Sequence, residues 1–318
     1  MSDSISKHIV IPREYHGQRI DIVLAQLFPD YSRSQLSTWL KQGAITLNQR
    51  HCKPKDKVAD GDEIDMQVEF SQSNTLPSLP EDIPLNIVYE DEHLLVINKP
   101  AGLVVHPGAG NREHTLVNAL LHHASQLASL PRAGIIHRLD KDTTGLLVIA
   151  KSLVAHTNLV RQMQAREIHR CYITLVQGHL ISGGEIDTFY GRHPRNRLKM
   201  AVCQQGRQAI TLYSIRKQYH DYTLLDVELL TGRTHQIRVH MAYINHPVVG
   251  DQLYGGRMRF PAQPTQELRD ILQGFQRQAL HASSLSFVHP VTEEEMTFEA
   301  PLPDDFQRLL QTLDNHLD

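Results

Sequence analysis

A polar turn that runs directly into an apolar segment constrains this chain more than any other stretch. Residues 137–145 read His-Arg-Leu-Asp-Lys-Asp-Thr-Thr-Gly, and residues 146–150 read Leu-Leu-Val-Ile-Ala. A short apolar run after glycine predicts a buried strand. The polar cluster then lies at the end of a rigid element, where a catalytic group is held best. The same residues also fit a surface turn in which Asp140 or Asp142 accepts backbone hydrogen bonds.

Length and composition predict two soluble domains with one sizeable core. The chain has 318 residues, of which 41% are hydrophobic and 21% are charged, and its formal net charge is −3. These values suit two domains of ordinary size. The sequence has no run of 18 apolar residues and no apolar segment of a signal peptide near its polar start. We therefore expect a monomeric cytoplasmic protein without a membrane segment.

Cysteine and histidine spacing argues against a disulfide framework and against a metal site. The three cysteines are odd in number and far apart: Cys52, Cys171 and Cys203. No C-x-x-C pair is present, so a zinc ribbon is not expected. The chain has twenty histidines, but His122 and His123 are adjacent and His235 and His240 are five apart. Neither spacing is that of a helical zinc pair, so we expect no metal.

The first 70 residues predict a small domain of two helices and a short sheet. Apolar residues at positions 20, 23, 24 and 27 lie on one face of a helix. Ser32 is a suitable N-cap for a second helix that Gly43 would end. Strands follow over residues 44–47 and 63–70. We place this domain at residues 17–70 and treat residues 1–16 as a lead-in outside it.

This small domain is basic although the whole chain is slightly acidic. Between residues 33 and 57 one acid, Asp56, accompanies six cations: Arg33, Lys41, Arg50, Lys53, Lys55 and Lys57. Clustered cations on a small domain indicate phosphate contact, and the alternative is a solvated charged face. The stretches 17–21, 32–34 and 43–48 resemble an S4 RNA-binding domain. We expect Arg33, Lys41, Lys53, Lys55 and Lys57 to contact RNA.

Residues 71–83 form a linker by composition, and residues 84–318 form a second domain. The runs 87–90 and 94–97 flank an acidic turn and predict a hairpin. Further strands are expected over residues 171–176, 222–230, 279–287 and 296–299, and helices over 115–123, after Ser152 and over 306–313. Because strands outnumber helices and hairpins are frequent, the fold class is α+β with a mixed, mostly antiparallel sheet.

A second basic segment lies within the large domain. Residues 188–220 contain no acidic residue and seven cations: Arg192, Arg195, Arg197, Lys199, Arg207, Arg216 and Lys217. Such a window indicates a surface that faces phosphates, and a basic loop without a ligand is the alternative. We expect Arg192, Arg195, Arg197 and Lys199 to contact nucleic acid.

Residues 231–240 are interpreted as an extension of the strand 222–230. With a period of two, Arg233, His235 and Ile237 share one face, which suits the wall of a binding site. The candidate reactive groups are then Asp140, Tyr172 and Arg233. An aspartate paired with arginine stays ionised when it is desolvated, and it can attack carbon as a nucleophile. The sequence lacks the G-x-S-x-G motif of serine hydrolases.

Four motifs in sequence order resemble those of the RluA family of pseudouridine synthases. They lie at residues 98–108, 137–145, 170–172 and 232–240, and the resemblance covers nearly all of residues 84–300. Cys171 departs from the pattern, because an acidic residue is expected there. It alternates with Tyr172 along the strand and leaves the role of the tyrosine undisturbed. The resemblance implies the pseudouridine synthase fold and requires no cofactor.

The resemblance also implies a mechanism and a substrate. Asp140 attacks a flipped uridine, at the uracil ring or at ribose C1′, and Tyr172 stacks on the base. Arg233 forms an ion pair with Asp140, and Arg138 fills the space that the flipped nucleotide leaves. Further contacts to the substrate or RNA are expected from His137, Thr144, His235 and Ile237. Residues 104–111, 140–145 and 192–194 resemble a subgroup that modifies 23S ribosomal RNA in a stem-loop at the subunit interface.

Three other functions are compatible with parts of this pattern. A non-catalytic RNA-binding or ribosome-assembly protein would explain both basic surfaces but not the reactive cluster at Asp140. A synthase that acts on another rRNA or tRNA uridine would explain both. A metal-dependent hydrolase that uses the histidines is weak on spacing.

Overall fold

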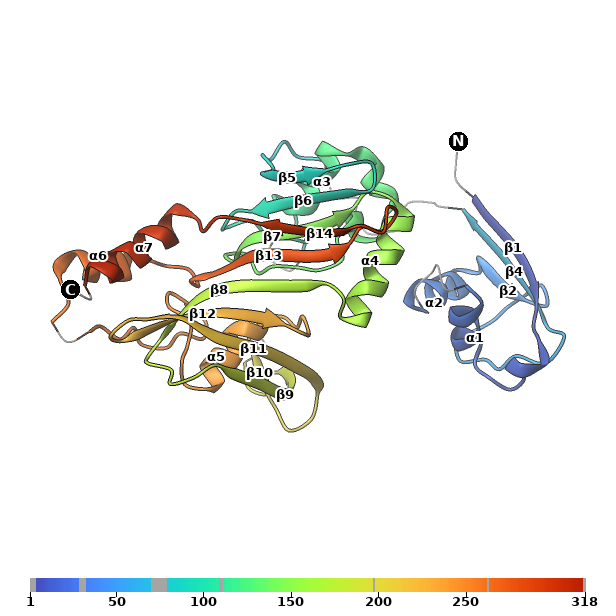
Figure 1. Cartoon of the computed structure of the whole chain (residues 1–318). Helices are drawn as coiled ribbons and strands as arrows, with labels where there is room; N and C mark the ends of the chain where they lie inside the picture. Colours follow the sequence, from blue (N-terminus) through green and yellow to red (C-terminus); the bar gives the residue numbers. More distant parts are fainter. Residues whose placement is uncertain are drawn as a thin grey trace. The chain divides into compact units, whose positions relative to one another are not determined.

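The computed structural model describes residues 4–28, 33–69, 79–108, 111–196, 198–261 and 263–316. The chain divides into two compact units, Met1–Pro77 and Ser78–Asp318 (Figure 1). Three predictions lie outside the described residues: Ser32 as a helix cap, Arg197 as an RNA contact and residues 71–78 as a linker.

The N-terminal unit is a four-stranded antiparallel sheet with two helices, in the strand order β1-β4-β2-β3. Its elements are β1 (Ser4–Val10), η1 (Arg13–Tyr15), α1 (Ile20–Leu27), α2 (Arg33–Gln42), β2 (Ile45–Leu47), β3 (Arg50–His51) and β4 (Glu63–Glu69). The apolar face of α1 and the inner face of β4 meet in one core, with Ile20, Leu24, Ile64 and Met66 fully buried. The helices and strands predicted for residues 20–70 are confirmed.

The lead-in predicted for residues 1–16 is wrong for its described part. β1 pairs with β4 over its whole length, from Ser4 opposite Glu69 to Val10 opposite Glu63. Ile11 is buried in the same core. The strand was missed because it lies at the sheet edge and carries polar residues such as Lys7 and His8, which are typical of edge strands.

The C-terminal unit contains a ten-stranded mixed sheet in the order β10-β9-β11-β12-β8-β13-β7-β6-β5, with β14 beside β13. In chain order its elements are β5 (Ile87–Glu90), β6 (Leu94–Lys99), α3 (Leu116–His123), η2 (Ser125–Ser129), η3 (Pro131–Gly134), β7 (Thr144–Ala150), α4 (Leu153–Ala165), β8 (His169–Gln177), β9 (Gly184–Arg192), β10 (Met200–Val202), β11 (Arg207–Gln218), β12 (Tyr222–Leu229), α5 (Gln236–Tyr243), α6 (Gln266–Gly274), β13 (Leu280–Val288), β14 (Glu295–Glu299) and α7 (Asp304–Asn315). The α+β class is confirmed, since β13–β7 is the one parallel pair among the named strands.

The central strands are buried on both faces. In β6 and β7, Leu95 and Leu147 belong to a core that α3 covers, whereas Leu94 and Leu146 belong to a core that α4 covers. Burial on both faces explains why residues 146–150 form a continuous apolar run rather than an alternating one. No helix in the described ranges is long and apolar enough to cross a membrane.

Two boundaries differ from the sequence interpretation. Residues 79–83 pack on the C-terminal unit instead of belonging to the linker, because the Asn118 amide donates to the Leu79 carbonyl at 2.7 Å and Ile83 contacts the core. The segment 236–240 is helical, not extended. β12 ends at Leu229, His235 adopts a left-handed conformation (φ 60°, ψ 22°) in the following turn, and α5 begins at Gln236.

Candidate active site

The polar turn of residues 137–145 has the predicted form. The Thr143 amide donates to the Asp140 carbonyl at 3.1 Å, which closes a tight turn, and Leu139 is buried in the core. Gly145 has a φ of 114°, and a Cβ there would lie 2.2 Å from the Ala282 carbonyl oxygen of β13. Only glycine fits this close approach of two backbones. The turn is therefore fixed at one end by the buried Leu139 side chain and at the other by the close approach of β13 to Gly145.

Lys99 at the end of β6 fixes the middle of the same turn. Its side chain is fully buried, and Nζ donates to the carbonyls of Pro100 at 2.7 Å, Leu103 at 3.0 Å and Lys141 at 2.9 Å. Burial lowers the pKa of Lys99 to about 7. Three carbonyl acceptors match the three N–H groups of an ammonium, so the protonated form satisfies all of them.

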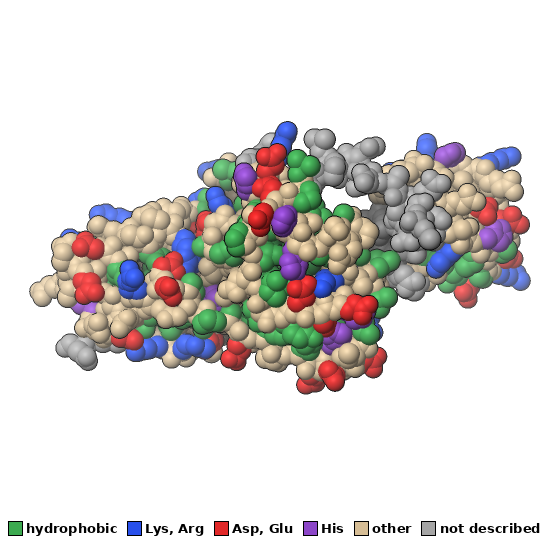
Figure 2. Space-filling model, turned by 90° about the horizontal axis from the view of Figure 1, so that it is seen from above, with side chains coloured by type: hydrophobic (Ala, Val, Ile, Leu, Met, Phe, Trp, Pro, Cys, Tyr) green, Lys and Arg blue, Asp and Glu red, His purple; other side chains and the backbone are tan. Residues whose placement is uncertain are grey.

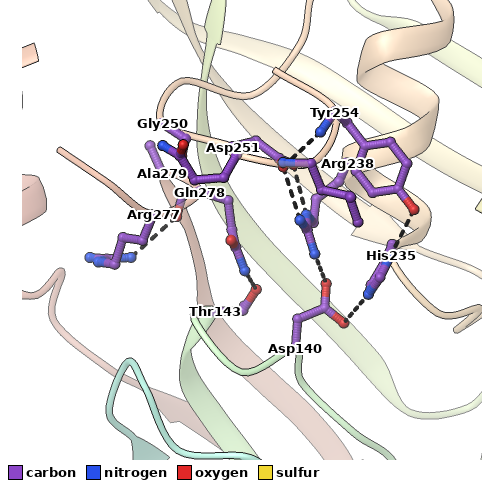
Figure 3. Close-up of polar contacts among 12 residues, drawn as sticks. Asp140, Thr143, His235, Arg238, Gly250, Asp251, Tyr254, Arg277, Gln278 and Ala279 are labelled. Atoms are coloured by element: carbon purple, nitrogen blue, oxygen red, sulfur yellow. Dashed lines mark hydrogen bonds and ion pairs between the residues drawn. The ribbon is translucent and has the colours of Figure 1, made fainter. Parts of the chain in front are cut away.

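The Asp140 side chain is one end of a row of three charged groups (Figure 3). Arg238 donates from Nη1 to Asp140 Oδ2 at 2.9 Å. On its other side the guanidinium binds Asp251 in a bidentate pair, with Nε–Oδ2 at 2.7 Å and Nη2–Oδ1 at 2.9 Å. We call Asp140, Arg238 and Asp251 the charge row. It leaves Oδ1 of Asp140 without a hydrogen bond in the described structure.

The buried Asp251 fixes the position and the charge of Arg238. The Asp251 side chain has no exposed surface and also accepts the amides of Leu253 and Tyr254. Burial alone would raise the pKa of Asp251, but hydrogen bonds from Arg238 and these amides lower it below its ordinary value. Burial alone would lower the pKa of Arg238, yet Asp251 and then Asp140 raise it. The guanidinium is therefore a fixed cation beneath Asp140.

His235 and Tyr254 line the other side of Asp140. His235 Nδ1 lies 2.8 Å from the Tyr254 hydroxyl, and its Nε2 lies 3.8 Å from Asp140 Oδ1. The Tyr254 ring also contacts two cations, with Arg238 Cζ 5.2 Å and Lys199 Nζ 5.7 Å from its centroid. Cation–π contacts of this kind stabilise the ring position. Lys199 thus connects the basic segment 188–220 to the active site.

Tyr172 lies in β8 close to Asp140, as expected. The ring is buried, and β8 places Tyr172 between Val227 of β12 and Ala282 of β13. Burial raises the pKa of its phenol, and the charge of Asp140 raises it further. The phenol therefore stays protonated near neutral pH. Ile237 is buried in the same core.

The ion pair predicted between Arg233 and Asp140 is wrong. Arg233 precedes α5 and donates from Nε to the Gln208 carbonyl at 3.2 Å. The cation on Asp140 is Arg238, which the extended interpretation placed on the opposite face from His235. On a helix, residues three apart share a face, so His235 and Arg238 both reach Asp140. The H-x-x-R spacing at 235–238 is the signal that could have found this pair. Asp251 and Tyr254 were missed because they lie in a loop.

Two residues of the turn that were expected to contact substrate instead point into the protein. His137 Nε2 accepts the Val148 amide at 3.2 Å, and burial lowers the pKa of His137 to about 3. It is neutral and cannot serve as a phosphate-binding cation. The Thr144 hydroxyl bonds to His281 Nδ1 at 2.8 Å and is also buried. Arg138 remains exposed beside Asp140 and keeps its predicted role as an expectation.

The predicted RNA-contacting cations differ in their exposure and in the ion pairs that they form. In the N-terminal unit four are exposed: Lys41, Lys53, Lys55 and Lys57. Arg33 is exposed too, but it forms an ion pair with Asp21 at 2.7 Å. In the segment 188–220, Arg192 and Arg195 are exposed. Arg216 and Lys217 bind Asp226 and Asp314, each at 2.7 Å. Acidic and basic side chains are interspersed on the face seen in Figure 2. Among the described residues, no group of three or more metal-ligating side chains gathers.

Comparison with known proteins identifies the class. Residues 93–243 match the RNA pseudouridylate synthase family, and residues 18–64 match the S4 domain. A relative from Xanthomonas campestris is 51% identical over 311 residues, which cover 98% of this chain and 93% of that protein. A relative from Pseudomonas aeruginosa is 51% identical over 313 residues, with 98% and 97% covered. The chain belongs to the RNA pseudouridylate synthase family and is an RNA pseudouridine synthase. Both relatives are named ribosomal large subunit pseudouridine synthase D.

A solved structure supports the fold of the C-terminal unit. Human RNA pseudouridylate synthase domain containing 4 is 26% identical, with a TM-score of 0.56 over 72% of this chain and 93% of that one. The family resemblance and the N-terminal S4 domain expected from the sequence are therefore confirmed.

Proposed function

We propose that this protein converts uridines of 23S ribosomal RNA to pseudouridine, in the stem-loop at the subunit interface. Two relatives of about half identity over nearly the whole chain are named as synthases of the large ribosomal subunit. The S4 domain and its exposed lysines suit an RNA substrate. We further propose that the protein works in the cytoplasm. We also propose that it works as a monomer, because one chain supplies every member of the charge row.

One observation carries the mechanism: Asp140 has one oxygen bound to Arg238 and the other free beside His235. The free carboxylate oxygen is placed to attack the nucleotide as a nucleophile. The C1′–N1 bond then breaks, the base rotates, a C1′–C5 bond forms and the bond to Asp140 is released. C5 loses a proton and N1 takes one up, so the reaction is an isomerisation. Tyr172 stacks on the ring and keeps it in the site during rotation.

The target uridine has to leave the RNA stack before Asp140 can reach it. Extrusion costs a few kcal/mol and is easiest in a loop, which agrees with a stem-loop target. The exposed Arg138 lies two residues before Asp140, so it is placed to fill the space that the base vacates. Neither step needs a metal or an organic cofactor.

Substitution of Asp140 tests the mechanism. Asp140→Asn keeps the size of the side chain and a hydrogen bond to Arg238 but removes the nucleophile. We expect pseudouridine formation to fall by at least about 10³-fold, while RNA affinity is retained. Asp142→Asn is the matched control, since Asp142 lies in the same turn, and its activity is expected to stay close to wild type. Activity retained in Asp140→Asn would reject the nucleophile.

Chemical mapping of pseudouridines tests the substrate. Ribosomal RNA and tRNA from cells with and without the gene are compared, together with the same RNAs from cells that carry Asp140→Asn. We expect loss of pseudouridine at sites in one 23S stem-loop in both deficient strains. Loss of sites in tRNA or 16S rRNA alone would assign another substrate. An unchanged map with defective ribosome assembly would favour the non-catalytic RNA-binding function, which the basic S4 unit also fits.

A further inference from the structure

His235 is the residue of the active site whose chemistry the mechanism above leaves unused. It is a non-glycine residue in the left-handed region, directly before α5. Such a conformation is unfavourable and persists at positions where the surrounding structure requires it. The conformation directs the ring at Asp140, with 19% of the side chain exposed (Figure 3). The backbone is therefore built to hold an imidazole at this point.

The hydrogen bonds around Tyr254 determine which nitrogen of His235 carries the proton. The Met200 amide donates to the Tyr254 oxygen at 2.8 Å. This oxygen also lies 2.8 Å from His235 Nδ1. Within the described residues no other acceptor takes the phenol proton, so the phenol donates it to Nδ1. In a neutral imidazole the remaining proton is then on Nε2.

The charge of Asp140 favours the same tautomer. Nε2 faces Asp140 Oδ1 at 3.8 Å. A lone pair on Nε2 would point at a carboxylate, whereas an N–H there is attracted to it. Burial lowers the pKa of His235, so the ring is neutral at neutral pH. A cationic ring would compete for the free carboxylate oxygen, and a neutral donor leaves that oxygen reactive.

Among the residues that the structure describes, this N–H has no hydrogen-bond acceptor. The distance of 3.8 Å to Asp140 is too long for a hydrogen bond. The other carboxylate oxygen is occupied by Arg238, so a nucleotide that reacts must do so at Oδ1, beside this donor. Uracil has carbonyl oxygens at C2 and C4, and cytosine has an amino group at C4. A fixed N–H can donate to a carbonyl oxygen but is repelled by an amino group, so a contact at C4 would distinguish uracil from cytosine.

The geometry points to His235 as a base-recognition residue that donates from Nε2 to a carbonyl oxygen of the flipped uracil. Tyr254 is the positioning residue that fixes the proton on Nε2. The inference rests on the proposed function, because it presumes that a uridine occupies the site beside Asp140.

The test combines substrate analogues with variants of His235. The substrate is a synthetic stem-loop that carries uridine, 2-thiouridine or 4-thiouridine at the mapped position, since sulfur is a poor acceptor. Wild type is expected to lose about tenfold in rate on one of the two thio-analogues. His235→Phe should lose about tenfold on uridine and show no additional loss on that analogue. His235→Gln restores a donor near Nε2 and should recover most of the rate. His220→Phe, in an exposed turn, is the matched control.

Other outcomes separate this inference from the proposed function. If His235→Phe is slower by the same factor on all three RNAs, and wild type still discriminates against sulfur, His235 does not contact the carbonyl. If wild type fails on unmodified RNA, the proposed function is wrong. The donor is then tested alone by ¹⁵N NMR of the histidine rings, with His235 assigned by its loss in His235→Phe. A neutral ring with the proton on Nε2 is expected, and Tyr254→Phe should shift protons toward Nδ1. A wild-type ring protonated on Nδ1, or charged, overturns the inference.

Discussion

Each unit of this protein contains a cluster of arginine and aspartate, but the most exposed partner differs. In the N-terminal unit, Asp21 is buried and binds two half-exposed arginines, Arg19 and Arg33, at 3.1 and 2.7 Å. In the C-terminal unit, Arg238 and Asp251 are buried, and Asp140 is the most exposed of the three, at 13% of its side chain. The same two residue types therefore produce opposite exposed charges.

In each cluster the buried residues keep a fixed position, and the most exposed residue is accessible to a ligand. Burial alone would raise the pKa of Asp21, but Arg33 and Arg19 lower it. Asp21 thus holds two cations at a surface that suits phosphates. Arg238 holds one oxygen of Asp140 and leaves the other to react. The function of an ion pair is therefore best inferred from its more exposed partner.

Removal of Arg238 should have the largest effect. Arg238→Ala leaves Asp251 buried without its cation, which is expected to lower the free energy of unfolding by about 3–5 kcal/mol. Pseudouridine formation should be lost as well, because Asp140 loses its partner. Urea unfolding and a rate assay measure the two effects. Arg233→Ala is the matched control, and a larger loss of rate there than in Arg238→Ala would contradict the assignment of the ion pair.

Neutralisation of Asp251 should have a smaller effect that depends on pH. Asp251→Asn keeps the shape of the side chain but frees Arg238 to turn, so kcat is expected to fall by about 10–100-fold. The pKa of Asp251 is lowered in the folded protein from an ordinary value of 3.8. Its stabilisation is therefore complete above that value and is lost as pH falls through the folded pKa. The stability difference between wild type and variant should shrink below about pH 4, and a constant difference would reject the linkage.

Neutralisation of the exposed lysines tests the function assigned to the N-terminal unit. The triple variant Lys53→Gln, Lys55→Gln, Lys57→Gln should reduce the salt dependence of RNA binding by about two units in the log–log slope. Affinity should fall with it, while the rate at saturating RNA stays unchanged. Binding titrations from low to moderate salt measure the slope. An unchanged slope would show that RNA contacts another surface.

Substitution of Asp21 should have the smallest effect. Asp21→Asn frees two exposed arginines, and pairs of this kind contribute about 0–1 kcal/mol. We expect a slight loss of stability and an RNA affinity equal to or above that of wild type. A large loss of RNA affinity would show that the geometry of the arginines matters more than their charge.

The polar turn and the strand after it could be predicted from the sequence because their signals are local. The run 146–150 is apolar since both faces of β7 are buried. Gly145 marks the point where the backbones of β7 and β13 approach each other closely. Asp140 was found through this context. The fold class followed from the hairpins and the alternating strands, which are local as well.

Helix α5 could not be predicted in the same way. Its first six residues have no solvent face: Gln236, Arg238 and His240 are buried like Ile237, and the exposed Tyr243 lies at the end of the helix. A helix without a solvent face lacks the apolar period that marks a helix in a sequence. Its polar side chains are satisfied by distant partners, such as Thr211 for His240 at 2.8 Å. The partner of Asp140 was therefore misassigned, because the residue period was read as that of a strand.

The charge row also has a consequence for the synthesis of the protein. Arg238 follows Asp140 by 98 residues, and His281 of β13, which binds Thr144 in the same turn, follows Thr144 by 137. During translation Asp140 emerges from the ribosome long before Arg238 and β13. A nascent chain that ends before β13 thus carries Asp140 in a site that is not yet assembled. The Asp140 site is therefore assembled only when the last part of the chain has folded, whereas the N-terminal unit is complete much earlier.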